Sequence, residues 1–233
     1  MSALLYRWPA AAKFGRVVPK AKFYEQATIS AALREKFVSE VQRITWAYKL
    51  ADETIHLRGD DSVPEIQVFV VEAKDDDVSG DVINAIDRAV PFPIIFEISR
   101  ATGGTRMVAS HKQLDGLAPR LSAYFTTEWH AADAPRASLP PALDLPGLYA
   151  GLLTPILPIA TRPGEDISAA TGRMHRVAKL ERDVAVLEKK LRNEPQFNRK
   201  VQLRRQFRAR TAELALLIDT ATPMTEDTPW TNY

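Results

Sequence analysis

Glu72 and Lys74 have the types and spacing that metal-dependent cleavage of phosphodiesters requires. They follow an apolar run at residues 66–71 (Ile-Gln-Val-Phe-Val-Val) that is typical of a buried central strand. Because side chains two positions apart point to the same face of a strand, the carboxylate and the ammonium group share a face. In such a site carboxylates hold Mg²⁺ and the lysine orients or activates the attacking water.

A second carboxylate for this site is predicted just after the preceding strand. If the two strands form a hairpin centred near Asp61, Glu72 lies opposite Ala51, and Asp52 or Glu53 lies beside it. Asp52 and Glu72 would then be the Mg²⁺ ligands and Asp52, Glu72 and Lys74 the catalytic set. The pattern is that of restriction-type nucleases.

A simpler interpretation competes with the nuclease one. Polar residues commonly mark the point where a strand leaves the core, and the Pro-Asp pair usual in such nucleases is absent. Glu40, on the preceding helix, could support the site. We expect a protein without catalytic activity, keeping the nuclease as an alternative.

The second candidate for chemistry is a basic helix late in the chain. It carries six cationic residues with no acidic residue among them: Arg199, Lys200, Arg204, Arg205, Arg208 and Arg210. Such residues bind nucleic-acid phosphates with an affinity that grows with the number of charges neutralised. The alternatives are an acidic partner protein, a solvated face, or pairing with acidic residues such as Glu181, Asp183 and Glu188.

A third feature is an apolar seam in the helix before it. Its members are spaced three, four, three and four residues apart, as in a coiled coil: Val177, Leu180, Val184, Leu187 and Leu191. The seam predicts a homodimer or the docking of a partner subunit. Packing on the second helix or on the N-terminal domain would use the same residues.

Composition excludes several other classes of site. The chain has 233 residues and no cysteine, so it has no disulfide, thiolate metal site or cysteine nucleophile. Its four histidines are dispersed, and no phosphate-binding glycine loop or nucleophile elbow is present. Lys20 and Lys22 precede Phe23 and Tyr24 and could contact phosphates, although a surface lysine pair is the simpler interpretation.

We expect no cofactor, except Mg²⁺ under the nuclease alternative. The N-terminus lacks the features of a signal peptide, and no apolar run reaches the length of a membrane span. A cytoplasmic protein without membrane contact is therefore expected.

The elements predicted for residues 1–130 form an α/β domain of the mixed α+β kind. After an irregular segment over residues 1–24, the spacing predicts a helix from residue 31 to about residue 44 and a strand over 46–58 that is interrupted at 51–53. The remaining elements are strands at 66–71, 94–98, 106–110 and 121–126 and a helix at 82–89. Together they predict a mixed sheet of about five strands flanked by helices.

Residues 131–165 form a proline-rich connector with one short helix near 145–153. Residues 166–220 are predicted to form coiled-coil-like helices, as a basic helical hairpin or as one helix kinked at Pro195, because proline breaks helical hydrogen bonding. A flexible tail is expected over 221–233.

Three blocks carry a resemblance to a known family. They are Val-Pro-Lys-Ala-Lys-Phe-Tyr at 18–24, the strands and helix within 44–96, and Glu-Pro-Gln-Phe-Asn-Arg-Lys-Val at 194–201. The chain resembles the bacterial domain-of-unknown-function family 4391 over nearly its whole length. That resemblance implies a coiled-coil-like C-terminal segment and a gene setting beside DNA methyltransferases and helicases of restriction or phage-defence type. It assigns no catalytic residue.

The combined expectation is a non-catalytic accessory component of a DNA-processing or phage-defence assembly, which binds nucleic acid or a partner protein through the basic helices. A Mg²⁺-dependent restriction-type nuclease and a homodimeric scaffold are the alternatives.

Overall fold

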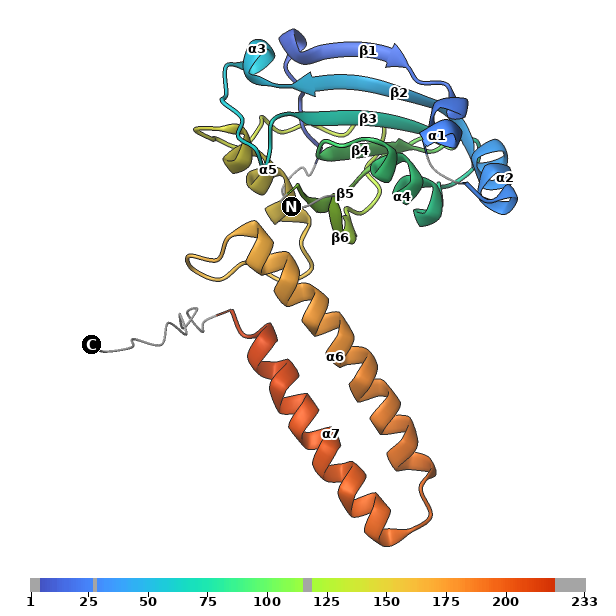
Figure 1. The fold of residues 1–233 in the computed structure, drawn as a ribbon, viewed down its shortest axis with the longest axis vertical. Helices are drawn as coiled ribbons and strands as arrows, with labels where there is room; N and C mark the ends of the chain where they lie inside the picture. Colours follow the sequence, from blue (N-terminus) through green and yellow to red (C-terminus); the bar gives the residue numbers. More distant parts are fainter. Residues whose placement is uncertain (1–4, 27–28, 115–118, 221–233) are drawn as a thin grey trace, which may run out of the picture. The chain divides into compact units, whose positions relative to one another are not determined.

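A mixed β-sheet forms the centre of the N-terminal part of the chain (Figure 1). The computed structural model describes residues 5–26, 29–114 and 119–220, and the chain divides into two compact units, residues 1–157 and 158–233. Within the described residues the sheet has six strands: β1 (Lys13–Val17), β2 (Val41–Leu50), β3 (Ile66–Ala73), β4 (Ile94–Ser99), β5 (Thr105–Gln113) and β6 (Arg120–Thr126).

The strands lie in the order in which they occur in the chain. All neighbours are antiparallel except β3 and β4, which are parallel and are joined by the crossover helix α4 (Gly80–Ala89). The mixed fold class predicted from the sequence is confirmed, and β3 is the buried central strand that its apolar run indicated. The additional strand is β1, which lies in the segment expected to be irregular.

Several helices complete the N-terminal unit. They are η1 (Ala10–Ala12), α1 (Lys20–Gln26), α2 (Ala31–Glu40), α3 (Asp52–Ile55), α5 (Leu145–Leu153) and η2 (Thr154–Ile156). Ser30 caps α2 by accepting a hydrogen bond from the Leu33 amide at 3.2 Å. One core cluster includes Phe37 of α2, Phe69 and Phe96 of the sheet and Ile86 of α4.

The boundary between α2 and β2 differs from the prediction. Val41 and Ile44 match the apolar spacing of the helix before them, but the structure places both in β2, where they pair with Ala73 and Val71. β-branched side chains favour extended backbone, and pairing with β3 buries both completely or nearly so. The strand therefore begins five residues earlier than predicted and ends at Leu50.

A buried ionic cluster holds the end of α4 against β5. The Lys112 ammonium lies 2.6 Å from Asp87 Oδ1, and both side chains are 1% exposed. Lys112 also donates to the carbonyls of Asp87, Val90 and Phe92 at 2.7 to 2.8 Å. These carbonyls lie at the helix C-terminus, where a cation is favoured.

The other oxygen of Asp87 is also hydrogen-bonded. Asp87 Oδ2 accepts from the Ser110 hydroxyl at 2.9 Å and from the Tyr124 hydroxyl at 2.8 Å. Burial lowers the pKa of Lys112, and the charge of Asp87 partly offsets this effect. The Lys112 ammonium group and both Asp87 carboxylate oxygens thus have polar partners, so we infer that the cluster stabilises the fold.

Two long helices, α6 (Ile167–Asn193) and α7 (Phe197–Ile218), form an antiparallel hairpin in the second unit (Figure 1). Asp166 caps α6 by accepting from the Ala169 amide at 2.8 Å, and Pro195 lies in the turn between the helices. Of the two arrangements predicted for residues 166–220, the structure has the hairpin. The tail predicted over 221–233 lies outside the described residues.

The segment predicted as a connector, residues 131–165, is divided between the two units. Its first part contains α5, with the bounds expected from the sequence. Among the described residues, no helix combines the length and the apolar content that crossing a membrane needs.

Candidate nucleic-acid interface

The register of β2 and β3 separates the two carboxylates of the predicted nuclease site. Glu72 pairs with Arg43, whereas Leu50, which precedes Asp52 by two residues, pairs with Ile66. Glu72 lies six residues further along β3 than Ile66, which corresponds to roughly 20 Å along the strand. The prediction that Asp52 and Glu72 share one Mg²⁺ is therefore wrong, because β2 begins earlier and the connection to β3 is longer than a tight hairpin.

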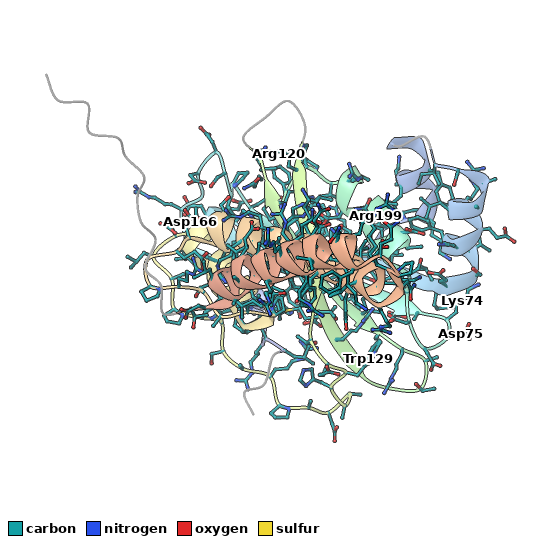
Figure 2. All side chains as sticks on the ribbon, turned by 90° about the horizontal axis from the view of Figure 1, so that it is seen from below. Lys74, Asp75, Arg120, Trp129, Asp166 and Arg199 are labelled. Carbon is teal, nitrogen blue, oxygen red and sulfur yellow. The ribbon has the colours of Figure 1, made fainter. Side chains whose placement is uncertain are left out.

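A cation occupies the position where the second carboxylate would be needed. Arg43 donates to Glu72 Oε1 from Nε at 2.8 Å and from Nη2 at 2.6 Å. Lys74 and Asp75, labelled in Figure 2, follow the strand and are exposed. The other acidic candidates are engaged elsewhere, since Glu53 pairs with Lys49 at 2.6 Å and Glu40 accepts from the Ser79 amide at 2.7 Å.

In the described part of the chain, no three histidine, aspartate or glutamate side chains come together in a way that could hold a metal ion. The nuclease alternative thus loses its predicted ligand pair. Glu72 and Lys74 do lie together at the carboxyl end of β3, where both line one groove.

The hairpin carries the apolar seam as predicted, but with graded burial. Val177 and Leu180 are buried, whereas Val184, Leu187 and Leu191 are half-buried. The packing of α6 along α7 explains the coiled-coil spacing without a second chain. The formation of a homodimer, or the docking of a partner subunit, through this seam stays a prediction.

Two arginines hold α6 and α7 together at the open end of the hairpin, which is the end away from the turn at Pro195. Arg173 of α6 donates from Nε to Glu165 Oε1 and from Nη2 to Glu165 Oε2, both at 2.7 Å, and both side chains are nearly fully buried. Arg173 also donates to the carbonyls of Leu217 at 3.0 Å and Ala160 at 2.8 Å. Arg162 donates to the carbonyls of Leu216 and Asp219, so cations satisfy the C-terminal carbonyls of α7.

Acid is expected to loosen this fastening. Hydrogen bonds from Arg173 hold the pKa of Glu165 below its ordinary value of 4.5. A lowered pKa in the folded state contributes stability above pH 4.5, and this contribution is lost as the pH falls through the folded pKa. We expect the midpoint of hairpin unfolding, followed by helical circular dichroism, to be constant from neutral pH to about pH 5 and to fall below it. In Glu165→Gln this acid dependence should be reduced; an unchanged profile would contradict the role of Glu165.

The opposite end of the hairpin is strongly basic. Residues 188–210 contain nine lysines and arginines against two glutamates, Glu188 and Glu194. All six cations predicted from α7 lie here, and all but the half-buried Lys200 are exposed. Since Lys200, Arg204 and Arg208 are four residues apart, they form one row along the helix.

Most of this charge has no acidic partner. Arg192 pairs with Glu188 at 3.3 Å and Arg210 with Glu213 at 2.6 Å. Within the described residues, no ion pair is formed by the other five cations of α7: Arg199, Lys200, Arg204, Arg205 and Arg208. Like charges four residues apart destabilise a helix slightly, by about 0.2–0.5 kcal/mol per pair. The repulsion within this row therefore destabilises the isolated hairpin slightly, and a bound anionic ligand would remove it.

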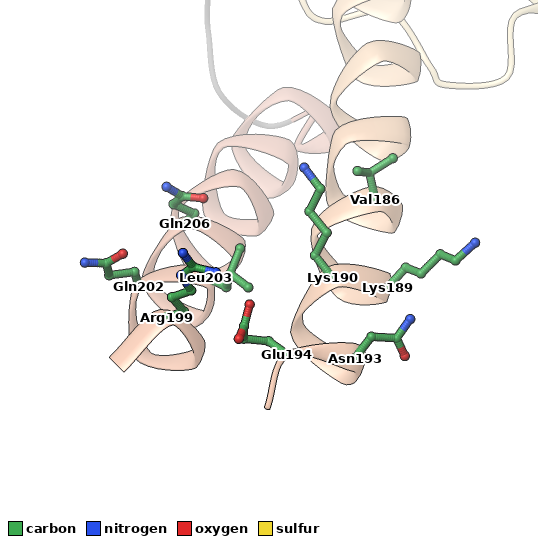
Figure 3. A pocket seen from close by; sticks show the side chains of 9 residues that line it. All are labelled: Val186, Lys189, Lys190, Asn193, Glu194, Arg199, Gln202, Leu203 and Gln206. Carbon is green, nitrogen blue, oxygen red and sulfur yellow. The ribbon is translucent and has the colours of Figure 1, made fainter. Parts of the chain in front are cut away.

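A groove of about 610 Å³ lies between the helices at this basic end (Figure 3). Its lining combines cations, side-chain amides and an apolar pair: Lys189, Lys190 and Arg199, then Asn193, Gln202 and Gln206, then Val186 and Leu203, with Glu194 as the one acid. In Figure 3 the Lys190 side chain lies between the two helices, whereas Lys189 points away from α7.

Sequence reasoning missed the contribution of α6 to this surface. Lys189, Lys190 and Arg192 lie in the last turns of α6, and the antiparallel turn at Pro195 brings Lys189 and Lys190 into one groove with Arg199. The signal was the Lys-Lys-Leu-Arg sequence at 189–192, which becomes part of one basic surface only if the chain folds back. We call Lys189, Lys190, Arg192, Arg199, Lys200, Arg204, Arg205 and Arg208 the basic tip.

The fold and the basic tip together define a mixed α/β protein with an appended basic helical hairpin. The chain belongs to the family described as a domain of unknown function (DUF4391), whose model matches residues 7–214. That match spans both units and confirms the resemblance seen in the sequence. A search of curated proteins and a search of solved structures each found no match.

Proposed function

We propose that this protein is a non-catalytic nucleic-acid-binding component of a DNA-processing or defence assembly, and that it contacts the phosphate backbone of duplex DNA through the basic tip. The observation that carries the proposal is the concentration of unpaired cations at one end of the hairpin. Cations that served only solubility or helix stability would be expected to alternate with acids, as Glu188 and Arg192 do.

The chemistry of the basic tip suits sequence-independent contact with phosphates. Arginine forks and lysine ammonium groups bind phosphate oxygens, and each neutralised phosphate releases bound counterions. Asn193, Gln202 and Gln206 add donors that can reach phosphate or sugar oxygens. Neighbouring DNA methyltransferase and helicase genes, which the family resemblance implies, fit this function.

The test is the salt dependence of binding to a labelled DNA duplex, followed by fluorescence anisotropy between about 50 and 200 mM salt. Exchanging Arg204→Glu together with Arg208→Glu is expected to weaken binding at least about tenfold and to reduce the slope of log K against log salt by about 2, since each phosphate contact contributes about 0.9. The two side chains are exposed, so the hairpin should keep its helical signal.

A matched control separates the basic tip from net charge. Arg7→Glu with Lys13→Glu makes the same change in charge at exposed positions of the N-terminal unit, and it should leave the salt slope unchanged. Equal losses in both double variants would mean that net charge alone drives binding. An unchanged affinity and slope in the Arg204 and Arg208 variant would refute the proposal.

A further inference from the structure

The carboxyl ends of the parallel strands β3 and β4 open into a groove that the proposed function does not use. Two hollows of about 360 and 350 Å³ share Gln42 and Glu72 in their linings. The first also includes Lys20 and Arg43, and the second includes the residues that follow the two strands: Lys74, Ser99 and Arg100. We call the two hollows the strand-end groove.

The strand-end groove has an excess of positive charge. Lys20, Arg43, Lys74 and Arg100 line it against the single carboxylate of Glu72. Arg43 neutralises that carboxylate by two hydrogen bonds to one oxygen. Burial lowers the pKa of Lys20, and the positive charge of Lys74 lowers it further. The two ammonium groups therefore repel each other, and a bound anion would relieve that repulsion.

Several donors of the groove are unused. In the described structure the Gln42 amide, the Ser99 hydroxyl and the Lys74 ammonium group have no hydrogen-bond partner. The described side chain of Arg100 donates only from Nε, to the Gly103 carbonyl at 2.8 Å, which leaves both terminal nitrogens available.

The guanidinium of Arg100 is also held in place. It lies over the Trp129 ring, with its carbon 4.8 Å from the ring centroid. Trp129 is labelled in Figure 2. A guanidinium that is fixed by stacking and by one hydrogen bond loses little entropy on binding an anion.

The acidic run after β3 limits the size of the anion. Asp75 and Asp76 are exposed directly after Lys74, and Asp77 pairs with Arg106 at 2.7 Å. These carboxylates confine the positive potential to the groove and repel an extended phosphodiester backbone. One compact dianion fits this arrangement better than a polymer does.

We propose that the strand-end groove binds the dianionic phosphate of a small phosphate monoester, with Lys74 and Arg100 as charged donors and Gln42 and Ser99 as neutral ones. Lys20, whose ammonium group already donates to the Val41 carbonyl, adds positive charge and its remaining N–H groups. Free phosphate and a nucleoside monophosphate are the two sources of this chemistry. The inference is independent of DNA binding by the hairpin, because none of its residues belongs to the basic tip.

The test uses the full-length protein and nuclear magnetic resonance of the backbone amides during titration with inorganic phosphate, adenosine 5′-monophosphate and adenosine. Both phosphate compounds are expected to shift the amides of residues 72–75 and 99–101, and adenosine is not. Equal affinities for inorganic phosphate and adenosine 5′-monophosphate would show that the groove contacts only the phosphate group. Tighter binding of the nucleotide would show that the groove also contacts the nucleoside. No shift with either phosphate compound, or equal shifts with adenosine, would overturn the proposal.

Variants assign the binding to the groove. Lys74→Glu should weaken phosphate binding at least about tenfold, because an attractive charge becomes a repulsive one. Gln42→Glu, at an exposed position that lines both hollows, should weaken it in the same direction. Lys13→Glu, at the other end of β1 from the groove, is the matched control and should bind as the wild type does. Unchanged binding in both groove variants would refute the assignment.

Discussion

Replacing Lys112 with methionine is expected to lower the free energy of unfolding of the N-terminal unit by about 3–5 kcal/mol, the usual effect of removing one partner of a buried ion pair. Methionine keeps most of the side-chain volume, so packing changes little. The loss comes from the buried Asp87 carboxylate and the partly buried carbonyls of Val90 and Phe92, which lose the ammonium group that pairs with them.

Tryptophan fluorescence during chemical denaturation measures this effect. Trp8, Trp46 and Trp129 all lie in the N-terminal unit, so their emission follows its unfolding. Lys13→Met, at an exposed position, is the control and should change stability by less than about 0.5 kcal/mol. Adding Asp87→Asn to Lys112→Met should restore part of the loss, because the unpaired charge is then removed. A loss below about 1 kcal/mol in Lys112→Met would show that the pair is dispensable.

The second large effect is expected at the open end of the hairpin. Arg173→Ala should destabilise the packing of α6 and α7 by about 3–5 kcal/mol. The substitution removes both guanidinium hydrogen bonds of the Glu165 carboxylate, which keeps only the Arg162 amide as a donor. It also removes the donor of the Ala160 carbonyl and the nearer of the two donors of the Leu217 carbonyl. A single guanidinium joins the loop before α6, α6 itself and the last turn of α7, so its loss affects all three.

Circular dichroism and amide hydrogen exchange follow this change, because α6 and α7 are the longest helices in the described chain. Exchange is expected to accelerate along both helices. The matched control is Arg192→Ala on the same helix, whose exposed pair with Glu188 should contribute at most about 0.5 kcal/mol. Comparable losses in the two variants would show that burial of Arg173 has no special effect.

The cations of this chain thus serve distinct purposes that residue type alone does not reveal. Lys112 and Arg173 are buried, and every side-chain nitrogen of each donates at least one hydrogen bond, so their removal should affect folding. Arg204 and Arg208 are exposed and unpaired, so their removal should affect binding. Only burial and partners, which the tertiary structure supplies, separate the structural charges from the candidate binding charges.

The elements with strong local signals were predictable. The apolar run of β3, the amphipathic spacing of α4 and the proline break at Pro195 each determine a local structure with little help from the rest of the chain. The unpaired charge of α7 was also visible, because six cations occur there without an acid among them. These features suffice for the mixed fold class and for one side of the basic tip.

The register of β2 against β3 was not predictable in the same way. The apolar spacing of Phe37, Val41 and Ile44 fits a helix, and the choice of strand after Glu40 depends on a partner strand more than 20 residues away. That choice decided the candidate catalytic site, because it put Arg43 opposite Glu72 and left Asp52 at the far end of the strand.

The sequence by itself determined that Glu72 and Lys74 share one face at a strand end, because alternation along a strand is a local property. It also determined that the C-terminal helices are basic, because charge is a property of composition. Only the tertiary structure decided which residues meet Glu72 and Lys74, and which end of α6 lies beside the cations of α7. Both depend on long-range pairing, whose free energy comes from burial and hydrogen bonding between distant segments and not from the segments alone.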